Sequence, residues 1–135
     1  MDLEVYRKKV NQSRAFPVNT GARITVLSPD YAEVVLPIKE EHLNVSGIVQ
    51  GGVTYAIADF ATGMASKTRG TKTVTIESKI NYFRPGSLES GSIKAVASAR
   101  NAGRTIGVYY CDVFDEQEKL LASAVFTYFF LQEEL

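Results

Sequence analysis

A segment of helical length, residues 50–67, is apolar on nearly every side, and it constrains the fold more than any other part of the chain. Its apolar residues recur at the three- and four-residue spacing of an α-helix, at Val53, Ala56, Ile57, Phe60, Ala61, Met64 and Ala65. The opposite side carries the uncharged residues Tyr55, Ala58, Thr62 and Ser66. A helix that is apolar all round has to be buried. The sequence therefore predicts a central helix about 27 Å long that the rest of the chain covers.

The segments on either side of this helix alternate apolar and polar residues with the period of two that indicates β-strands. The predicted strands cover residues 23–27, 32–39, 73–82, 93–100, 105–114 and 120–131. The last four are longer than usual strands and follow one another through short turns, which predicts an antiparallel meander. Only the central helix is apolar enough to cover the inner face of such a sheet. We therefore expect an α+β fold in which an antiparallel sheet of five or six strands wraps around one long helix.

The size and charge of the chain limit the classes of protein to which it can belong. Its 135 residues are expected to form one domain, 1–135, in which residues 1–20 are a short helical extension. Fifteen Lys and Arg residues balance fifteen Asp and Glu residues, so nothing favours a nucleic-acid partner. One cysteine and one histidine exclude an intramolecular disulfide, a cysteine-based zinc cluster and a His-rich metal site. Because no apolar run reaches about 18 residues and the N-terminus is charged, we expect a cytoplasmic protein without a membrane partner.

Asp59 is the first candidate for a catalytic residue, because it is an acid in the middle of the apolar helix. A buried carboxylate is costly unless it is paired or hydrogen-bonded, and no Lys or Arg lies three or four residues away on either side. Acids in such settings cluster at functional sites, so Asp59 is expected to act as a general base or nucleophile in a dry site. The alternative is a structural aspartate that caps a kink or bonds a neighbouring backbone group.

The start of the helix, Gln50-Gly51-Gly52, is the second candidate site. The first N–H groups of a helix have no partner within it, and two glycines leave them uncovered, with the positive end of the helix dipole behind them. Such donors can stabilise the oxyanion of an acyl-transfer reaction. The glycines could instead allow close packing against a strand. In the preceding loop, Asn44 could bond a substrate carbonyl or could simply shape a turn with Gly47.

Three other features have structural explanations that we favour. His42 stands beside two glutamates in a polar loop and is expected to be solvated. Cys111 lies within a predicted strand and is expected to be a buried, inert thiol. Arg84, Arg100 and Arg104 lie at predicted strand ends, where they are either solvated or able to hold phosphates at the mouth of a cleft.

The run from His42 to Asp59 resembles the hotdog-fold acyl-CoA thioesterases of the phenylacetic-acid-degradation (PaaI) type. Their signature is an Asn and a Gly in a loop, then His-Gly-Gly, then an acid on the central helix. The later run from Asn81 to Gly86 is similar to the family's strand-end motif, and the closing strands are similar too. The chain departs from the signature where Gln50 replaces the usual His. The Gln50 amide can donate a hydrogen bond to a carbonyl or a leaving thiolate, but it cannot shuttle a proton.

The resemblance implies a hotdog fold and a homodimer whose sheets join edge to edge, often paired again as a dimer of dimers. It places the active sites at the dimer interface and implies an acyl-CoA substrate, with no cofactor and no metal. Asp59 would be the catalytic carboxylate, the N–H of Gly51 would polarise the thioester carbonyl, and Asn44 would position substrate or water. The other residues expected in the pocket are Gly52, Tyr55, Phe60, Phe83 and Arg84.

Thr75 matches the position of a family hydroxyl that reaches the site from the partner subunit. Strict alternation along residues 73–82 would put Thr75 on one polar face of its strand, together with Thr73, Glu77 and Lys79, which is compatible with that role.

Two other functions are open from the sequence. A hotdog dehydratase or hydratase would use a histidine, and His42 is the only one in the chain. A non-catalytic acyl-CoA-binding module would explain Gln50 at the position of the usual histidine.

Overall fold

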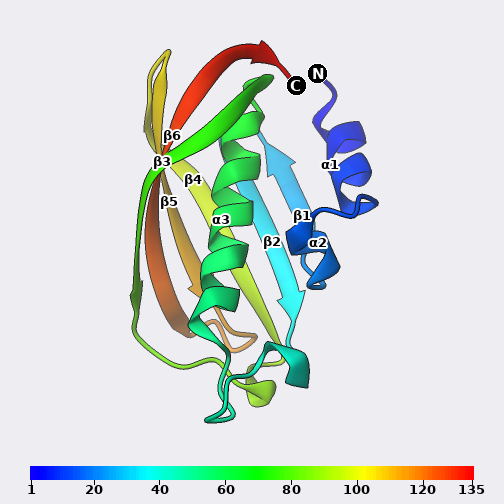
Figure 1. The fold of residues 1–135 in the computed structure, drawn as a ribbon, viewed down its shortest axis with the longest axis vertical. Coiled ribbons are helices and arrows are strands. Elements are labelled where there is room, and N and C mark those ends of the chain that lie inside the picture. The colour runs from blue at the N-terminus through cyan, green and yellow to red at the C-terminus, as the bar shows by residue number, and fades with distance from the viewer.

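Six strands form one antiparallel sheet in the computed structural model, which describes residues 1–135 (Figure 1). The strands are β1 (Arg23–Ser28), β2 (Tyr31–Pro37), β3 (Thr71–Tyr82), β4 (Ser92–Ala102), β5 (Ile106–Phe114) and β6 (Leu120–Glu134). The helices are α1 (Leu3–Asn11), α2 (Phe16–Asn19) and α3 (Gly51–Lys67), with 3-10 turns at Glu40–His42 and Leu88–Ser90. Every predicted strand and both predicted helices are present, with ends shifted by a few residues. The short helix α2 was not predicted.

The sheet curves around α3, and the core lies between them (Figure 1). Alternate residues of the strands point inward and are buried, among them Val34, Leu36, Ile93, Tyr109, Val113 and Phe126. On α3, Ala58, Ala61 and Ala65 have no exposed surface, and their small side chains let the helix approach β2 and β4 closely. This confirms the predicted α+β hotdog architecture. No helix of the structure combines the length and hydrophobicity needed to cross a bilayer.

The strand order differs from the simple meander that the sequence indicated. The order is β1-β2-β4-β5-β6-β3, so β3 lies at one edge of the sheet beside β6, and β4 pairs with β2. Periodicity identifies a strand from its own residues, but its neighbours depend on contacts with segments far away in the sequence. The prediction of four consecutive neighbours is therefore wrong for β3.

One edge of the sheet is covered and the other is open. At the β1 edge, α1 lies alongside, and the side-chain amide of Asn11 bonds both the N–H and the carbonyl of Ile24 at 2.9 Å. At the β3 edge no element lies alongside, and Val74 and Ile76 are 49% and 55% exposed. An open edge strand with exposed apolar side chains is a template for pairing with another strand.

A β-bulge in β3 changes which of its residues face the helix. Thr75 and Glu77 lie opposite consecutive residues of β6, so Ile76 is an extra residue between them. Thr73 and Thr75 therefore face α3, whereas Glu77 and Lys79 face the outer side of the sheet. The strict alternation that grouped Thr75 with Glu77 and Lys79 is wrong, because the bulge shifts the period by one residue.

His42 is buried, not solvated, and only 4% of it is exposed. Its Nδ1 accepts the N–H of Lys39 at 2.9 Å, so Nε2 carries the proton and donates to the carbonyl of Thr20 at 2.7 Å. The imidazole therefore joins the loop before α3 to the segment before β1. With both ring nitrogens occupied, His42 is not available for the acid–base chemistry of a dehydratase or hydratase.

The variant His42→Ala is expected to lower the free energy of unfolding by about 2–4 kcal/mol, because it removes a buried side chain that bonds the Lys39 N–H and the Thr20 carbonyl. Urea unfolding followed by circular dichroism measures this loss. Glu41→Ala, at the exposed neighbouring position, is the matched control and should unfold like the wild type. An unchanged midpoint for His42→Ala would contradict the structural role of the imidazole.

Candidate active site

The first turn of α3 presents free backbone donors. Gln50 precedes the helix, but its exposed side chain makes no hydrogen bond, and the N–H groups of Gly51 and Gly52 have no partner. The hydroxyl of Tyr82 donates to the Gly51 carbonyl at 2.8 Å, and a Cβ on Gly51 would stand 3.3 Å from that hydroxyl. Gly51 therefore both permits the close approach of β3 and leaves its N–H uncovered.

A cavity of about 310 Å³ adjoins this turn, and its walls include Asn44, Gly51, Thr54, Tyr82, Phe83 and Arg84. Asn44 shapes the loop beside it, because its Oδ1 accepts the N–H groups of Ser46 at 2.9 Å and Ile48 at 3.3 Å. The amide nitrogen of Asn44 has no partner and can still donate. The structure thus brings four of the predicted site residues together here: Asn44, Gly51, Phe83 and Arg84.

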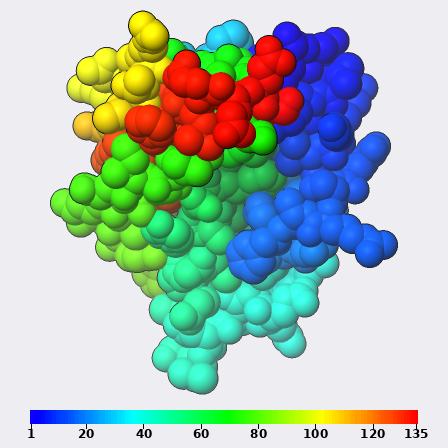
Figure 2. Space-filling model, turned by 45° about the horizontal axis from the view of Figure 1, so that its top comes forward, coloured from blue at the N-terminus to red at the C-terminus, as the bar shows by residue number.

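A second cavity, of about 210 Å³, surrounds Asp59 and is lined also by Phe60, Lys67, Thr73, Thr75 and Tyr128. The surface of α3 is visible in this region between β3 and the N-terminal segment that contains α2 (Figure 2). The hydroxyl of Tyr128 lies 3.5 Å from Oδ1 of Asp59 and 2.9 Å from Oγ1 of Thr62. Asp59 thus has a hydroxyl beside it and a lysine in the same cavity.

Asp59 is more exposed than the dry site that the sequence predicted. In the single chain its side chain is exposed, because it lies on the face of α3 that the sheet does not cover. The surrounding protein still displaces enough water to raise the pKa of the carboxyl above its ordinary value, against the opposing effects of the Lys67 charge and the Tyr128 hydroxyl. A raised pKa makes this carboxylate a stronger base than a solvated aspartate.

The remaining predicted residues lie on the same helix or on β3. Tyr55 lines neither cavity: its hydroxyl lies 2.5 Å from Oγ of Ser78, and its ring packs on Phe126 with centroids 5.4 Å apart. Gly52 is exposed beside the free end of the helix. Thr75, which the resemblance assigned to a partner's site, lines the Asp59 cavity of its own chain.

Sequence reasoning missed Lys67 and Tyr128. Lys67 lies eight residues from Asp59, so a search for partners three or four residues away did not reach it, although two turns of helix keep both on neighbouring faces. Tyr128 shares the inward face of β6 with Phe126 and Phe130, so the pattern of its own strand does not distinguish it from core residues.

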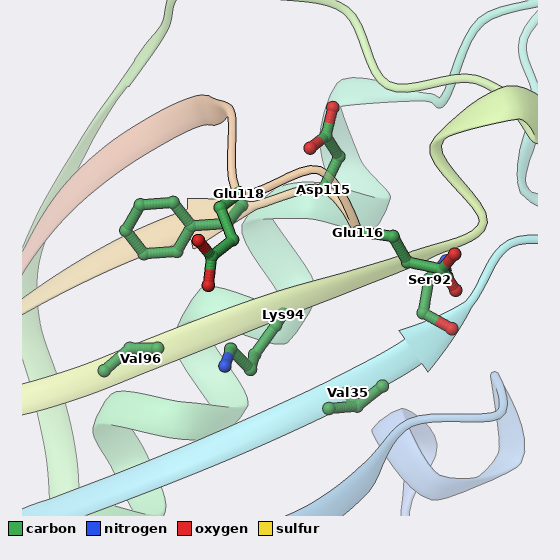
Figure 3. A pocket seen from close by; sticks show the side chains of 8 residues that line it. Val35, Ser92, Lys94, Val96, Asp115, Glu116 and Glu118 are labelled. Atoms are coloured by element: carbon green, nitrogen blue, oxygen red, sulfur yellow. Dashed lines mark hydrogen bonds between the residues drawn. The ribbon is translucent and has the colours of Figure 1, made fainter.

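A larger cavity, of about 500 Å³, lies on the outer face of the sheet, away from α3 (Figure 3). Its carboxylates Asp115, Glu116 and Glu118 belong to the turn between β5 and β6. Glu116 accepts the N–H of Ser92 at 3.0 Å and so holds this turn against β4. None of the predicted site residues lines this cavity.

Two of the minor predictions can be compared with the structure. Cys111 is buried, as predicted, and burial raises the pKa of its thiol to about 12. The three arginines do not gather at one cleft: Arg84 lines the Gly51 cavity, whereas Arg100 lies over the ring of Tyr110 at 5.3 Å. No cluster of His, Cys, Asp and Glu side chains is arranged to hold a metal ion.

Comparison with known proteins links this geometry to a family. The Thioesterase superfamily model matches residues 46–122. The acyl-coenzyme A thioesterase PaaI of Escherichia coli is 28% identical over 102 residues, which cover 76% of this chain and 72% of that protein. A mutant of the phenylacetic acid degradation protein PaaI from Thermus thermophilus has 34% identity and a TM-score of 0.81, covering 86% of this chain and 98% of that one.

A third similar protein comes from Streptococcus mutans and has been solved bound to acetyl CoA. It has 25% identity and a TM-score of 0.82, covering 92% of this chain and 97% of that one. The family match spans more than half of the chain. The chain therefore belongs to the thioesterase superfamily, among its PaaI-type hotdog members.

Proposed function

We propose that the protein is an acyl-CoA thioesterase that hydrolyses a thioester to the free acid and CoA. One observation carries this proposal: a single helix bears unpartnered N–H donors at Gly51 and Gly52 and a carboxylate of raised pKa at Asp59. Thioester hydrolysis needs donors for the oxyanion and a base or nucleophile for the attack. The E. coli relative, which is an acyl-CoA thioesterase, and the S. mutans structure with acetyl CoA support this substrate class.

The two groups cannot act on one substrate within a single chain. Gly51 and Asp59 are separated by eight residues of α-helix, a rise of about 12 Å. A reacting carbonyl group has to lie about 3 Å from both. If two copies of α3 lie antiparallel about a two-fold axis, Gly51 of one copy can lie beside Asp59 of the other. We therefore infer a homodimer with two shared sites.

The open β3 edge supports this assembly. Pairing of β3 with the same strand of a second copy would continue the sheet and cover Val74 and Ile76. It would also place the second copy against the uncovered face of α3, where Asp59 is exposed. The dry environment that a basic carboxylate requires would then form only in the dimer.

In such a site the thioester carbonyl oxygen accepts the N–H of Gly51, and the positive end of the α3 dipole stabilises the negative charge that develops there. Asp59 of the other copy either takes a proton from the attacking water or attacks the carbonyl carbon itself, forming an anhydride that water then opens. In both routes the carbon–sulfur bond breaks, CoA leaves as a thiolate, and the thiolate takes up a proton. Neither route requires Gln50 to move a proton.

A thiol-release assay tests the proposal. The purified protein is mixed with a panel of aliphatic and aromatic acyl-CoAs, and free CoA is followed with a thiol reagent. We expect release with at least one class of acyl group. If no thiol appears while acyl-CoA still raises the melting temperature, hydrolysis is contradicted and the non-catalytic binding module takes its place.

The pH profile of kcat/KM is expected to show an acid limb above the ordinary aspartate pKa of about 4. Activity should be present when Asp59 is ionised and lost as the pH falls through its raised pKa. Lys67→Met removes a charge that lowers this pKa, so the limb should move to higher pH. Lys94→Met, at an exposed lysine on the outer face of β4 that lies 3.4 Å from Glu33, should leave the limb in place. An identical limb in both variants would contradict the assignment of Asp59 as the titrating base.

A further inference from the structure

Lys67 ends α3 and lines the cavity that holds Asp59. We propose that its ammonium selects acyl groups that carry a carboxylate at their far end, so that the preferred substrates are CoA thioesters of dicarboxylic acids. This inference rests on the proposed function and names its substrate class.

A directed chain of hydrogen bonds holds the Lys67 ammonium at the cavity wall. The hydroxyl of Ser66 donates to the carbonyl of Gly63 at 2.8 Å, so its oxygen accepts the proton of the Thr73 hydroxyl, 2.9 Å away. Oγ1 of Thr73 is then left to accept from Nζ of Lys67 at 3.3 Å. One of the three ammonium donors is thus anchored, and the other two have no partner in the protein.

The Lys67 charge has no direct counterion. The side chain is half-buried, and burial lowers the pKa of its ammonium while the charge of Asp59 opposes that shift. The two side chains form no salt bridge, so Asp59 acts on Lys67 only across the cavity. An ammonium that has lost part of its hydration and keeps two free donors is suited to bind an anionic oxygen.

The cavity has room for the acyl part of such a ligand. Its volume is about 210 Å³, and a protein cavity of about 150 Å³ accommodates benzene. The buried side chains of Phe60 and Met64 supply apolar walls for methylene groups. Gly63 keeps the space beside Tyr128 and Lys67 open, because a Cβ there would stand 3.4 Å from the Tyr128 hydroxyl and 3.9 Å from Nζ of Lys67. An acyl chain of about five or six carbons that reacts at Asp59 would fit this space with its far end toward Lys67.

The test compares acyl-CoAs of equal length with and without a terminal carboxylate: glutaryl-CoA with pentanoyl-CoA, and adipyl-CoA with hexanoyl-CoA. For the wild type we expect kcat/KM to be higher for the carboxylated partner by about tenfold or more, because hydrogen bonds to charged groups are worth that much. Lys67→Met removes the charge at similar length and should abolish the preference. Lys94→Met, on the outer face of the sheet, should keep it.

The preference is the ratio of two kcat/KM values measured on the same variant at the same pH. A changed pKa of Asp59 or a smaller folded fraction alters both values by the same factor, so the ratio stays the same. The same ratio in Lys67→Met as in the wild type would overturn the proposal. Equal kcat/KM values for glutaryl-CoA and 5-hydroxypentanoyl-CoA would also overturn the proposal. The site would then recognise a polar end of the acyl chain and not its negative charge.

A binding measurement separates this inference from the proposed function. S-(4-carboxybutyl)-CoA and S-pentyl-CoA are thioethers that cannot be hydrolysed, and calorimetry gives their affinities. If the carboxylated thioether binds more tightly to the wild type and this advantage is lost in Lys67→Met, the selectivity is supported. Absence of acyl-CoA turnover beside that result would contradict only the proposed hydrolysis. Equal affinities for the two thioethers would overturn the selectivity whether or not thiol is released.

Discussion

Replacement of Asp59 by asparagine is expected to lower kcat/KM for acyl-CoA hydrolysis by about 10²–10⁴-fold, the contribution of a positioned general base. The amide keeps the shape of the side chain, but it can neither take up a proton nor attack a carbonyl carbon. The fold should survive, because Asp59 is exposed in the single chain and forms no salt bridge. Since the pKa of this carboxyl is raised in the folded chain, removing its charge should raise the melting temperature.

Asp112→Asn is the matched control for this substitution. Asp112 is also an exposed aspartate, but it lies on the outer face of the sheet, where it accepts the hydroxyl of Ser123 at 2.6 Å. Thiol release and thermal unfolding are measured on both variants. Equal activity of Asp59→Asn and Asp112→Asn would remove Asp59 from the chemistry.

Mixing two inactive variants is expected to restore activity if the sites are shared between two copies. Gly51→Pro removes the N–H donor, and a proline is tolerated at the first position of a helix. Gln50 already has φ −57° and ψ 133°, the conformation that a residue before proline prefers. Loss of this donor alone should lower kcat by about 10²–10³-fold.

A heterodimer of Gly51→Pro and Asp59→Asn contains one site with both groups intact and one site with neither. Random exchange of subunits should therefore recover about a quarter of the wild-type activity per chain. Each variant mixed with itself is the control and should stay inactive. Gly51→Ala keeps the N–H and should retain far more activity than Gly51→Pro. No recovery after verified subunit exchange would show that the two groups do not share a site across a dimer.

Local patterns in the sequence were enough to predict the secondary structure. Apolar residues repeat every three or four positions along a helix and every second position along a strand, so α3 and all six strands could be located from the sequence. Gly51 and Asp59 were also recognisable, because a glycine pair at a helix start and an acid in an apolar helix are local features. The burial of His42 was not, because its ring is held by the backbone of Thr20, which lies far away in the chain.

The position of β3 and the faces of its residues were likewise beyond prediction. Nothing within residues 71–82 indicates that they pair with β6 and not with β4, or that the ladder is interrupted at Ile76. A single inserted residue turns every following side chain to the other face. Thr75 lines the Asp59 cavity, but the sequence grouped it with the wrong neighbours.

By itself the sequence determined the distance between the two proposed reactive groups, since any helix over residues 51–67 holds Gly51 and Asp59 about 12 Å apart. Only the tertiary structure decided what surrounds Asp59. The pairing of β3 with β6 brings Tyr128 beside the carboxylate, and the bulge turns Thr73 toward Lys67. The physical reason is that the regular spacing of residues along a helix or strand depends only on its own backbone. Strand register and side-chain neighbours depend instead on how the whole sheet packs on the helix.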